Sequence, residues 1–223
     1  MKIIGHIETD FKEKFGIPRQ SGLVKESTGR ILLEKEYNVP EAFRGLEDFS
    51  HIWVLWQFSE AVRDNWSPTV RPPLLGGNKR MGVFATRSPF RPNNVGLSAL
   101  KLEKVEITKS EGVILHVSGA DLLDGTPIYD IKPYLPYADS IPEAIGGFAE
   151  TLAERKLTVI FPEKLLGKVS EEKRAALKAV LEADPRPSYQ NDPERIYGMK
   201  FASYEVHFRV DGKHLTVESV DKN

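Results

Sequence analysis

The sequence predicts a mainly β protein, with a β-barrel over residues 1–162 and a small α+β domain over residues 163–223. Short segments rich in β-branched and aromatic residues recur along the first 160 residues. Glycine, proline and asparagine separate these segments, as in Gly76-Gly77-Asn78. Long amphipathic helices do not alternate with them, which disfavours a doubly wound parallel sheet.

Eight segments are expected to be strands of the first domain or its margin. In chain order they are residues 3–7, 29–33, 51–58, 81–86, 97–107, 113–118, 128–131 and 157–161. The third of these is apolar almost throughout, which predicts a strand buried on both faces. Residues 40–46 are expected to form a short helix.

The second domain is expected to contain one helix and one hairpin. Ser170 is placed to cap a helix over residues 171–183. Three apolar residues at helical spacing predict its buried stripe: Leu177, Val180 and Leu181. Two alternating segments flank Asp211-Gly212, which predicts a hairpin over residues 203–220 with a type I′ turn.

Composition and charge exclude several classes of function. The chain has 223 residues, no cysteine and a formal net charge of −1. Disulfides, thiolate zinc sites, iron–sulfur clusters and cysteine nucleophiles are therefore excluded. The dinucleotide, P-loop and zinc-protease motifs are absent, and the five histidines lack metal-ligand spacing, so no metal is expected. Without an apolar run of about 20 residues or a secretory signal, we expect a cytoplasmic protein that does not enter a membrane.

Residues 66–100 carry five positively charged residues and no acidic residue. The five are Arg71, Lys79, Arg80, Arg87 and Arg91. Several prolines stiffen the same stretch. It is either a solvated loop or a site for phosphate or carboxylate groups held by arginine.

Two further patches are candidates for binding. Residues 15–22 combine glycine flexibility with a rigid proline. Residues 121–134 place three acids, a lysine and two tyrosines beside a strand. The second patch is either an ordinary turn or a site that offers acceptors for ribose hydroxyls and rings for base stacking.

Four segments, residues 14–20, 44–53, 81–93 and 121–134, together resemble the TsaA-like family, most closely its tRNA-methylating members. The likeness covers residues 3–160, and residues 184–189 resemble the additional C-terminal domain of bacterial-type members. It implies a β-barrel that binds S-adenosylmethionine without a Rossmann sheet, in a pocket completed by a homodimer. The implied reaction is methylation of the exocyclic nitrogen of threonylcarbamoyladenosine at position 37, in the anticodon loop of tRNA.

The resemblance also assigns residues to the cofactor. They are Pro18, Arg19, Gln20, His51, Ile52, Arg87, Leu97, Leu122, Leu123, Asp124 and Gly125. Losing its proton would help the poorly basic acceptor nitrogen. Asp130 and Tyr129 are the candidate catalytic residues for this step, with Asp124 a third candidate.

The RNA is expected to contact a separate set of residues: Arg71, Lys79, Arg80, Arg91, Lys132 and Tyr134. The rings available for base stacking near basic residues are Trp66, Phe90, Tyr129 and Tyr134. The C-terminal domain either widens this RNA-binding face, through Arg186, Arg195, Lys200 and Arg209, or simply caps the barrel.

Two other functions stay open at this point. One is methyl transfer from the same cofactor to another nucleoside or a small molecule. The other is a non-catalytic module that binds S-adenosylmethionine or RNA as a sensor. Turnover with labelled cofactor discriminates the sensor from both enzymes.

Overall fold

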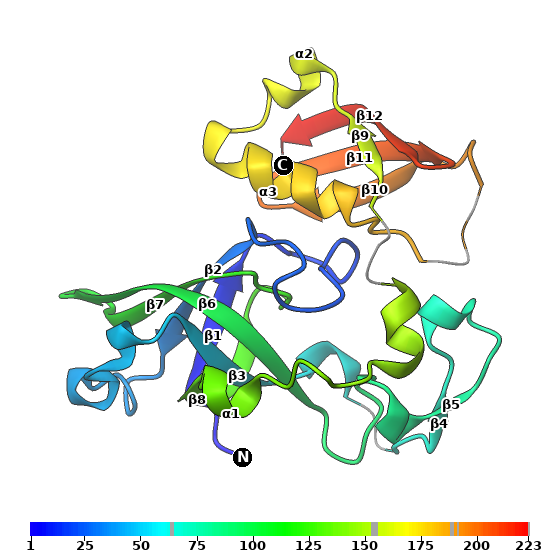
Figure 1. The fold of residues 1–223 in the computed structure, drawn as a ribbon. Coiled ribbons are helices and arrows are strands. Elements are labelled where there is room, and N and C mark those ends of the chain that lie inside the picture. The colour runs from blue at the N-terminus through cyan, green and yellow to red at the C-terminus, as the bar shows by residue number, and fades with distance from the viewer. Residues whose placement is uncertain (63–64, 153–155, 188–189, 191, 223) are drawn as a thin grey trace.

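A computed structural model describes residues 1–62, 65–152, 156–187, 190 and 192–222 (Figure 1). Six strands form a closed barrel in the order β1-β2-β7-β6-β3-β8, and the strands that pair are antiparallel. They are β1 (Gly5–Thr9), β2 (Thr28–Leu33), β3 (His51–Gln57), β6 (Val95–Thr108), β7 (Gly112–Ser118) and β8 (Thr126–Pro133). The predicted mainly β barrel is confirmed.

Alternation along β3 defines the inner and outer surfaces of the barrel. Ile52, Val54 and Trp56 are buried inside, whereas His51 is exposed and Trp53 is half-buried outside. The prediction that this strand is buried on both faces is therefore wrong. The barrel core covers only the inner face of β3, so the large apolar residues at the odd-numbered positions of this strand lie on the outside of the barrel.

A lobe of short elements is inserted between β3 and β6. It contains η3 (Ser59–Ala61), β4 (Thr69–Val70), η4 (Pro73–Leu75), β5 (Met81–Gly82) and η5 (Val83–Ala85). The expected strand over residues 81–86 therefore ends at Gly82. The Val83 carbonyl accepts hydrogen bonds from the Thr86 amide, the Thr86 hydroxyl and Arg91. These bonds close a 3-10 turn, so the segment after Gly82 does not continue as a strand.

Other connections contain short helical turns. The helix expected over residues 40–46 is two 3-10 turns, η1 (Pro40–Phe43) and η2 (Leu46–Asp48), interrupted by Gly45 with φ +83°. After β8 come α1 (Pro136–Asp139) and η6 (Gly147–Leu152), neither of which was predicted.

The C-terminal domain is a four-stranded sheet in the order β10-β11-β12-β9 with two helices. Its elements are β9 (Thr158–Ile160), α2 (Glu163–Leu166), α3 (Glu171–Glu182), β10 (Tyr197–Phe201), β11 (Tyr204–Asp211) and β12 (His214–Lys222). The predicted helix is confirmed, its stripe is buried, and Ser170 makes no side-chain cap. Residues 188 and 189 of the family-like segment lie outside the described residues.

Two details of this domain differ from the sequence expectation. Asp211 pairs with His214, so the hairpin loop is Gly212-Lys213, and only Gly212 has a positive φ. A type I′ turn needs positive φ at both central residues, so the turn is not of that type. Strand β9 pairs in parallel with β12, although it lies within the range 1–162 that the sequence assigned to the barrel.

Residues 10–24 belong to the connection from β1 to β2 and join the two domains (Figure 1). Phe11 and Val24, each 1% exposed, belong to the C-terminal hydrophobic core, and Phe15 and Ile17 pack against it. Asp10 forms a 2.7 Å ion pair with Lys173 of α3, and its carbonyl accepts a hydrogen bond from the Ala202 amide. The loop is therefore held by the domain that lies farthest from it in the chain.

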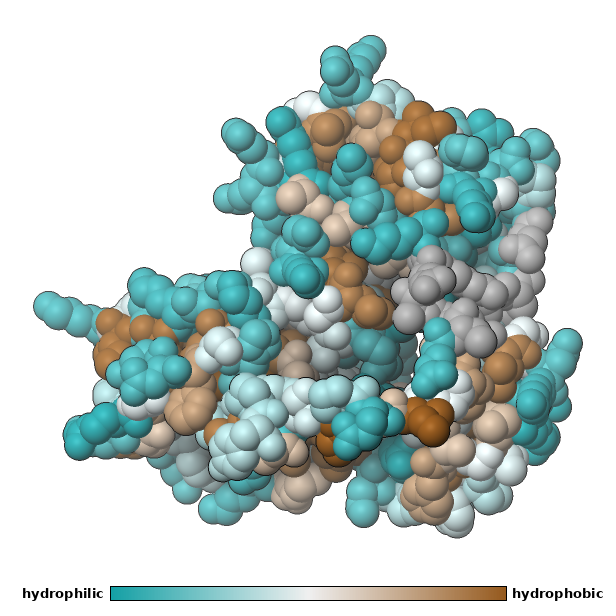
Figure 2. All heavy atoms as spheres, in the orientation of Figure 1, coloured by the Kyte–Doolittle hydropathy of each residue, from teal (hydrophilic) through white to brown (hydrophobic). Residues whose placement is uncertain are grey.

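The surface in Figure 2 is mostly hydrophilic, with apolar residues in separate small patches over both domains. Among the described residues, no helix is long and apolar enough to cross a membrane.

Replacing Phe11 with alanine should lower the free energy of unfolding by about 3–5 kcal/mol, because a buried phenylalanine leaves a cavity that its neighbours fill only partly. Chemical denaturation measures this loss. Ile145→Ala, at a side chain that is 89% exposed, is the control and should change stability by less than about 0.5 kcal/mol. Equal stability of the two variants would show that the loop is not anchored through Phe11.

Candidate functional site

A chain of hydrogen bonds runs from the barrel interior to Asp121 at one end of the barrel. The Trp56 indole N–H donates to Ser98 Oγ at 3.0 Å, and the Ser98 hydroxyl donates to Asp121 Oδ1 at 2.7 Å. Ser98 is 1% exposed, so the carboxylate that it contacts sits at the margin of the core. Burial raises the pKa of Asp121 to about 6, whereas the hydrogen bond from Ser98 and the charge of Arg87 act in the opposite direction.

Arg87 connects the basic stretch to the loop of residues 10–24. Its guanidinium donates to Gln20 Oε1, and the Gln20 amide donates to the Arg19 carbonyl. Arg19 in turn donates to the carbonyls of Asp184 and Arg186, at 3.3 and 2.9 Å. We call Gln20, Arg87, Ser98 and Asp121, with the turn of residues 121–125, the Asp121 site.

The turn of residues 121–125 offers main-chain donors more than side chains. The amides of Leu122 and Leu123 donate no hydrogen bond to any described residue. Those of Asp124 and Gly125 donate to the carbonyls of Phe11 and Ile7. Leu122 itself is 1% exposed and packs in the barrel core. Two adjacent unpaired amides beside a carboxylate are groups that a polar ligand can satisfy.

The Asp124 carboxylate closes this turn onto the start of the loop. It accepts a hydrogen bond from the Thr9 amide at 2.9 Å and pairs with Lys12 at 2.8 Å. Its oxygens are thus committed to holding the turn. A cavity of about 590 Å³ opens alongside, within the size range of small-molecule sites. It is lined by Lys12, Glu13, Lys14, Phe15, Glu60, Leu123 and Asp124.

Other predicted site residues lie on a different surface, the outside of β8, β3 and β6. Strand register places Leu55 between Asp130 on one side and Leu97 on the other. Leu97 is 53% exposed. We call this surface the outer face; it consists of His51, Trp53, Leu55, Leu97, Asp130, Lys132 and Tyr134.

The outer face contains the candidate catalytic residue Asp130, and it does not include the predicted cofactor residue Ile52. The Asp130 carboxylate pairs with Lys132 at 3.1 Å and accepts the Ile131 amide at 3.0 Å. Tyr129 lies at the bulge where β8 changes register against β3. Ile52 is fully buried inside the barrel, so its side chain is not available to a ligand.

The residues expected to bind RNA are divided in the same way. Arg71, Lys79 and Arg80 are exposed on the lobe, and Arg80 donates to Thr69 Oγ1 at 3.1 Å. Arg91 is half-buried and donates to the carbonyls of Val83 and Thr86, so it stabilises the lobe. Lys132 and Tyr134 are on the outer face.

The basic residues of the C-terminal domain have different surroundings. Arg186 is 7% exposed and is held by both oxygens of Asp184. Arg209 pairs with Glu218 at 2.8 Å, and Arg195 lies over the Tyr197 ring. Arg186 therefore supports the segment that contacts Arg19 and does not face solvent.

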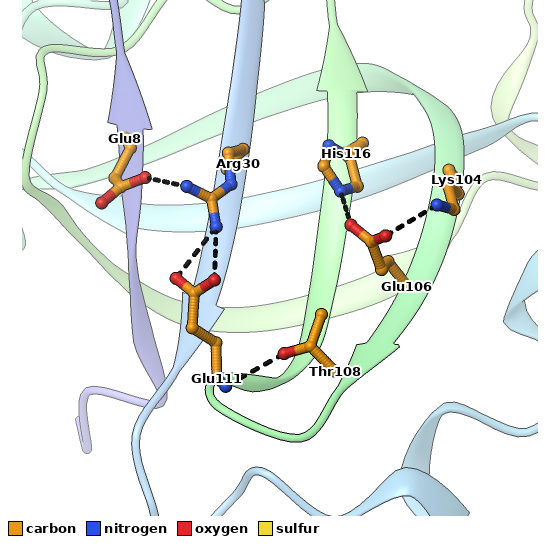
Figure 3. Close-up of polar contacts among 7 residues, drawn as sticks. All are labelled: Glu8, Arg30, Lys104, Glu106, Thr108, Glu111 and His116. Atoms are coloured by element: carbon orange, nitrogen blue, oxygen red, sulfur yellow. Dashed lines mark hydrogen bonds and ion pairs between the residues drawn. The ribbon is translucent and has the colours of Figure 1, made fainter.

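Figure 3 shows a separate cluster of charges on the outside of β1, β2, β6 and β7. Arg30 bridges Glu8 and Glu111, and Glu106 bridges Lys104 and His116 at 2.8 Å each. These bonds lower the pKa of Glu106, with the hydrogen bond from Lys104 first. The charges satisfy one another, and no group of described residues here or elsewhere is arranged to hold a metal ion.

Sequence reasoning did not assign Asp121, Ser98 or the contact of Arg19 with the C-terminal domain. Asp121 carried a signal, since it is an acid three residues after the strand-like segment 113–118. The Arg19 contact carried none, because its partners are backbone carbonyls more than 160 residues away.

Two family models match the chain. The model of the tRNA-methyltransferase O N-terminal domain matches residues 6–140, and that of the TrmO C-terminal domain matches residues 154–223. A "tRNA (adenine(37)-N6)-methyltransferase" of Escherichia coli is 45% identical over 93% of this chain and 91% of its own length. A "Putative S-adenosylmethionine-dependent methyltransferase RcsF" of Pseudomonas aeruginosa is 41% identical over 92% of this chain and 90% of its own. A crystal structure of TrmO from Pseudomonas aeruginosa superposes with a TM-score of 0.81 at 34% identity, covering 99% of this chain and 95% of that one.

Replacing Asp121 with asparagine should stabilise the protein at pH 7 and not at pH 4. The carboxyl titrates at about 6 in the folded chain and at its ordinary value of 3.8 in the unfolded chain. The folded state therefore binds more protons between these values, and wild-type stability falls as pH rises through them. Denaturation curves at several pH values should give an advantage of the variant that grows to about 1–3 kcal/mol and is constant above pH 7.

The Ser98→Ala variant serves as the control. Removing the hydroxyl that lowers the pKa of Asp121 should extend the loss of stability to higher pH. An asparagine variant whose advantage is the same at pH 4 and pH 7 would contradict the assignment of this titration to Asp121.

Proposed function

Because this chain belongs to the tRNA-methyltransferase O family, we propose that it transfers a methyl group from S-adenosylmethionine to N6 of adenine 37 in tRNA. The proposed acceptor is the N6-threonylcarbamoyl form of that adenosine. The observation that carries the proposal is that family likeness extends through both domains, which include every part of the Asp121 site. A cytoplasmic location follows from this proposal, since tRNA is its substrate.

The Asp121 site offers groups that fit S-adenosylmethionine. The Arg87 guanidinium suits the carboxylate of the amino-acid moiety. Asp121 suits the ribose hydroxyls or the ammonium group, and the unpaired amides of Leu122 and Leu123 suit acceptor atoms. S-adenosylmethionine would supply a methyl group that is already activated by its bond to a positively charged sulfur. The role of the protein is therefore to orient that methyl group toward the acceptor. Pro18 and Gly125 shape the backbone beside these groups.

The acceptor nitrogen is poorly basic, because its lone pair is shared with the purine ring and the carbamoyl carbonyl. A group that takes its proton during methyl transfer therefore favours the reaction. We assign this role to Asp130, with Tyr129 orienting the acceptor. Lys132 forms an ion pair with the Asp130 carboxylate at 3.1 Å and holds it in place. Asp124 is less suited to proton transfer, because its carboxylate holds the turn through Thr9 and Lys12 and its side chain is 32% exposed, against 47% for Asp130.

The Asp121 site and the outer face point in different directions within one chain, because Ser98 faces into the barrel and Leu97 faces out. We propose that they meet across a homodimer, with the outer face of one protomer completing the Asp121 site of its partner. His51, Leu97 and Asp130 would then act in the partner's pocket. The exposed Leu97 and the half-buried Trp53 and Leu55 support this, as apolar residues favoured at a protein interface.

The tRNA is proposed to lie over the lobe and the adjoining part of the outer face. Arg71, Lys79 and Arg80 extend from the lobe and are placed to meet phosphates of the anticodon loop. Lys132 and Tyr134 are proposed contacts beside the acceptor. Arg91 acts indirectly, by holding the 3-10 turn of the lobe.

A methyl-transfer assay with two tRNA pools tests the function. Purified protein and labelled S-adenosylmethionine should transfer label to tRNA that carries threonylcarbamoyladenosine and not to tRNA that lacks it. Label in neither pool, with measurable cofactor binding, would favour the sensor. Label in both pools, or in a small molecule, would favour another acceptor.

A mixing experiment tests the shared pocket. Arg87→Ala and His51→Ala homodimers should each have little activity, because each disables both pockets. Coexpressed with different tags, the two variants should regain about a quarter of wild-type activity, since half of the dimers are mixed and each mixed dimer keeps one intact pocket. Arg87→Ala mixed with Gln20→Ala, two changes on the same side of the pocket, should regain nothing. Activity equal in both mixtures would contradict a pocket built from two protomers.

A further inference from the structure

Two large aromatic rings are stacked on each other in the lobe and remain open to solvent. Trp66 is 48% exposed and Phe84 is 70% exposed. Their ring centroids are 6.1 Å apart, with an angle of 29° between the ring planes. Together they form the ring pair. Neither residue was assigned a role by the family likeness.

The backbone on both sides of the ring pair is fixed by hydrogen bonds. The Ser67 amide donates to the Phe90 carbonyl, and the Val83 amide donates to the Pro68 carbonyl. Strands β4 and β5 pair between these contacts. The Arg91 guanidinium lies 5.5 Å from the centre of the Phe84 ring, within the range of a cation–π contact. The exposure of the rings is therefore built into the lobe and does not result from a loose loop.

The positive charge of the lobe indicates which kind of molecule the ring pair binds. The stretch of residues 66–100, which contains both rings, has five basic residues and no acidic one. Arg71, Lys79 and Arg80 are exposed on the same lobe. Exposed rings and exposed cations on one lobe are the combination that binds single-stranded nucleic acid, with bases on the rings and phosphates on the cations.

The ring pair is also close in the chain to the Asp121 site. Phe84 precedes Arg87 by three residues, so their Cα atoms are separated by at most about 11 Å. Arg87 bonds Gln20 within that site. One short segment of the lobe therefore carries both a ring of the ring pair and an arginine of the Asp121 site.

We propose that Trp66 and Phe84 form a stacking platform for an unpaired base of the anticodon loop, next to the adenine that is methylated. This inference rests on the proposed function, because it takes tRNA as the substrate. An unpaired base can leave its neighbours and stack on a protein ring at little cost. The platform would bind the loop by its shape and would tolerate different bases, while the methylation pocket recognises the modified adenine.

Fluorescence titration of an anticodon stem-loop RNA carrying threonylcarbamoyladenosine tests the platform. Trp66→Ala and Phe84→Ala should each weaken binding on the order of 5- to 150-fold, whereas Trp66→Phe and Phe84→Tyr should retain most of it. The dependence of Kd on salt should keep its slope, because no phosphate contact is removed. Lys79→Ala should instead lower that slope by about one. Ile107→Ala, an exposed side chain at 63% outside the lobe, is the matched control and should bind like wild type.

Two further readouts separate this inference from the proposed function. If the alanine variants bind the stem-loop like wild type while methyl transfer proceeds, the platform is wrong and the function stands. If the wild type does not methylate the RNA but binds it with the same dependence on the rings, the platform stands without the function. A parallel loss of S-adenosylmethionine affinity, or of self-association, in the alanine variants would assign the rings to the cofactor or to a second copy of the chain and overturn the proposal.

Discussion

Phe11 and Val24 are part of the hydrophobic core of the C-terminal domain, although both precede the second strand of the barrel in the chain. The segment between them carries Arg19 and Gln20, whose contacts reach Asp184 on one side and Arg87 on the other. The geometry of the Asp121 site is therefore set by apolar packing at a distance from it. Each buried aromatic or aliphatic side chain contributes about 1.5–3 kcal/mol to this anchoring, more than an exposed polar contact provides.

The closed barrel imposes a second constraint, because every side chain on its strands faces either the core or the outside. Ser98 faces inward and holds Asp121, while its neighbour Leu97 faces outward beside Leu55. Residues that are adjacent in sequence thus belong to different surfaces. The proposed homodimer is one arrangement that would bring residues from both surfaces to one ligand.

The fold was largely predictable from local pattern, and the long-range contacts were not. Alternation and turn residues located most barrel strands, and helical spacing of Leu177, Val180 and Leu181 located α3. The pattern could not show that β9 pairs with β12, since a short apolar strand fits either sheet. Motif likeness predicted Gln20 and Arg87, which the structure brings together. It could not show that Asp124 is occupied by Thr9 and Lys12, or that Arg91 and Arg186 serve the fold, because those bonds depend on tertiary structure.

Strand β12 is the last of the described elements in chain order, and it occupies an inner position between β11 and β9. During synthesis, the barrel strands are complete once β8 has formed, but the C-terminal sheet has to wait for β12 before it can offer a core to Phe11. Residues 10–24 therefore reach their final place only after β12 has been made. A chain in which only the barrel has folded would still lack the anchored loop that carries Arg19 and Gln20, so the C-terminal sheet has to fold before this side of the Asp121 site is complete.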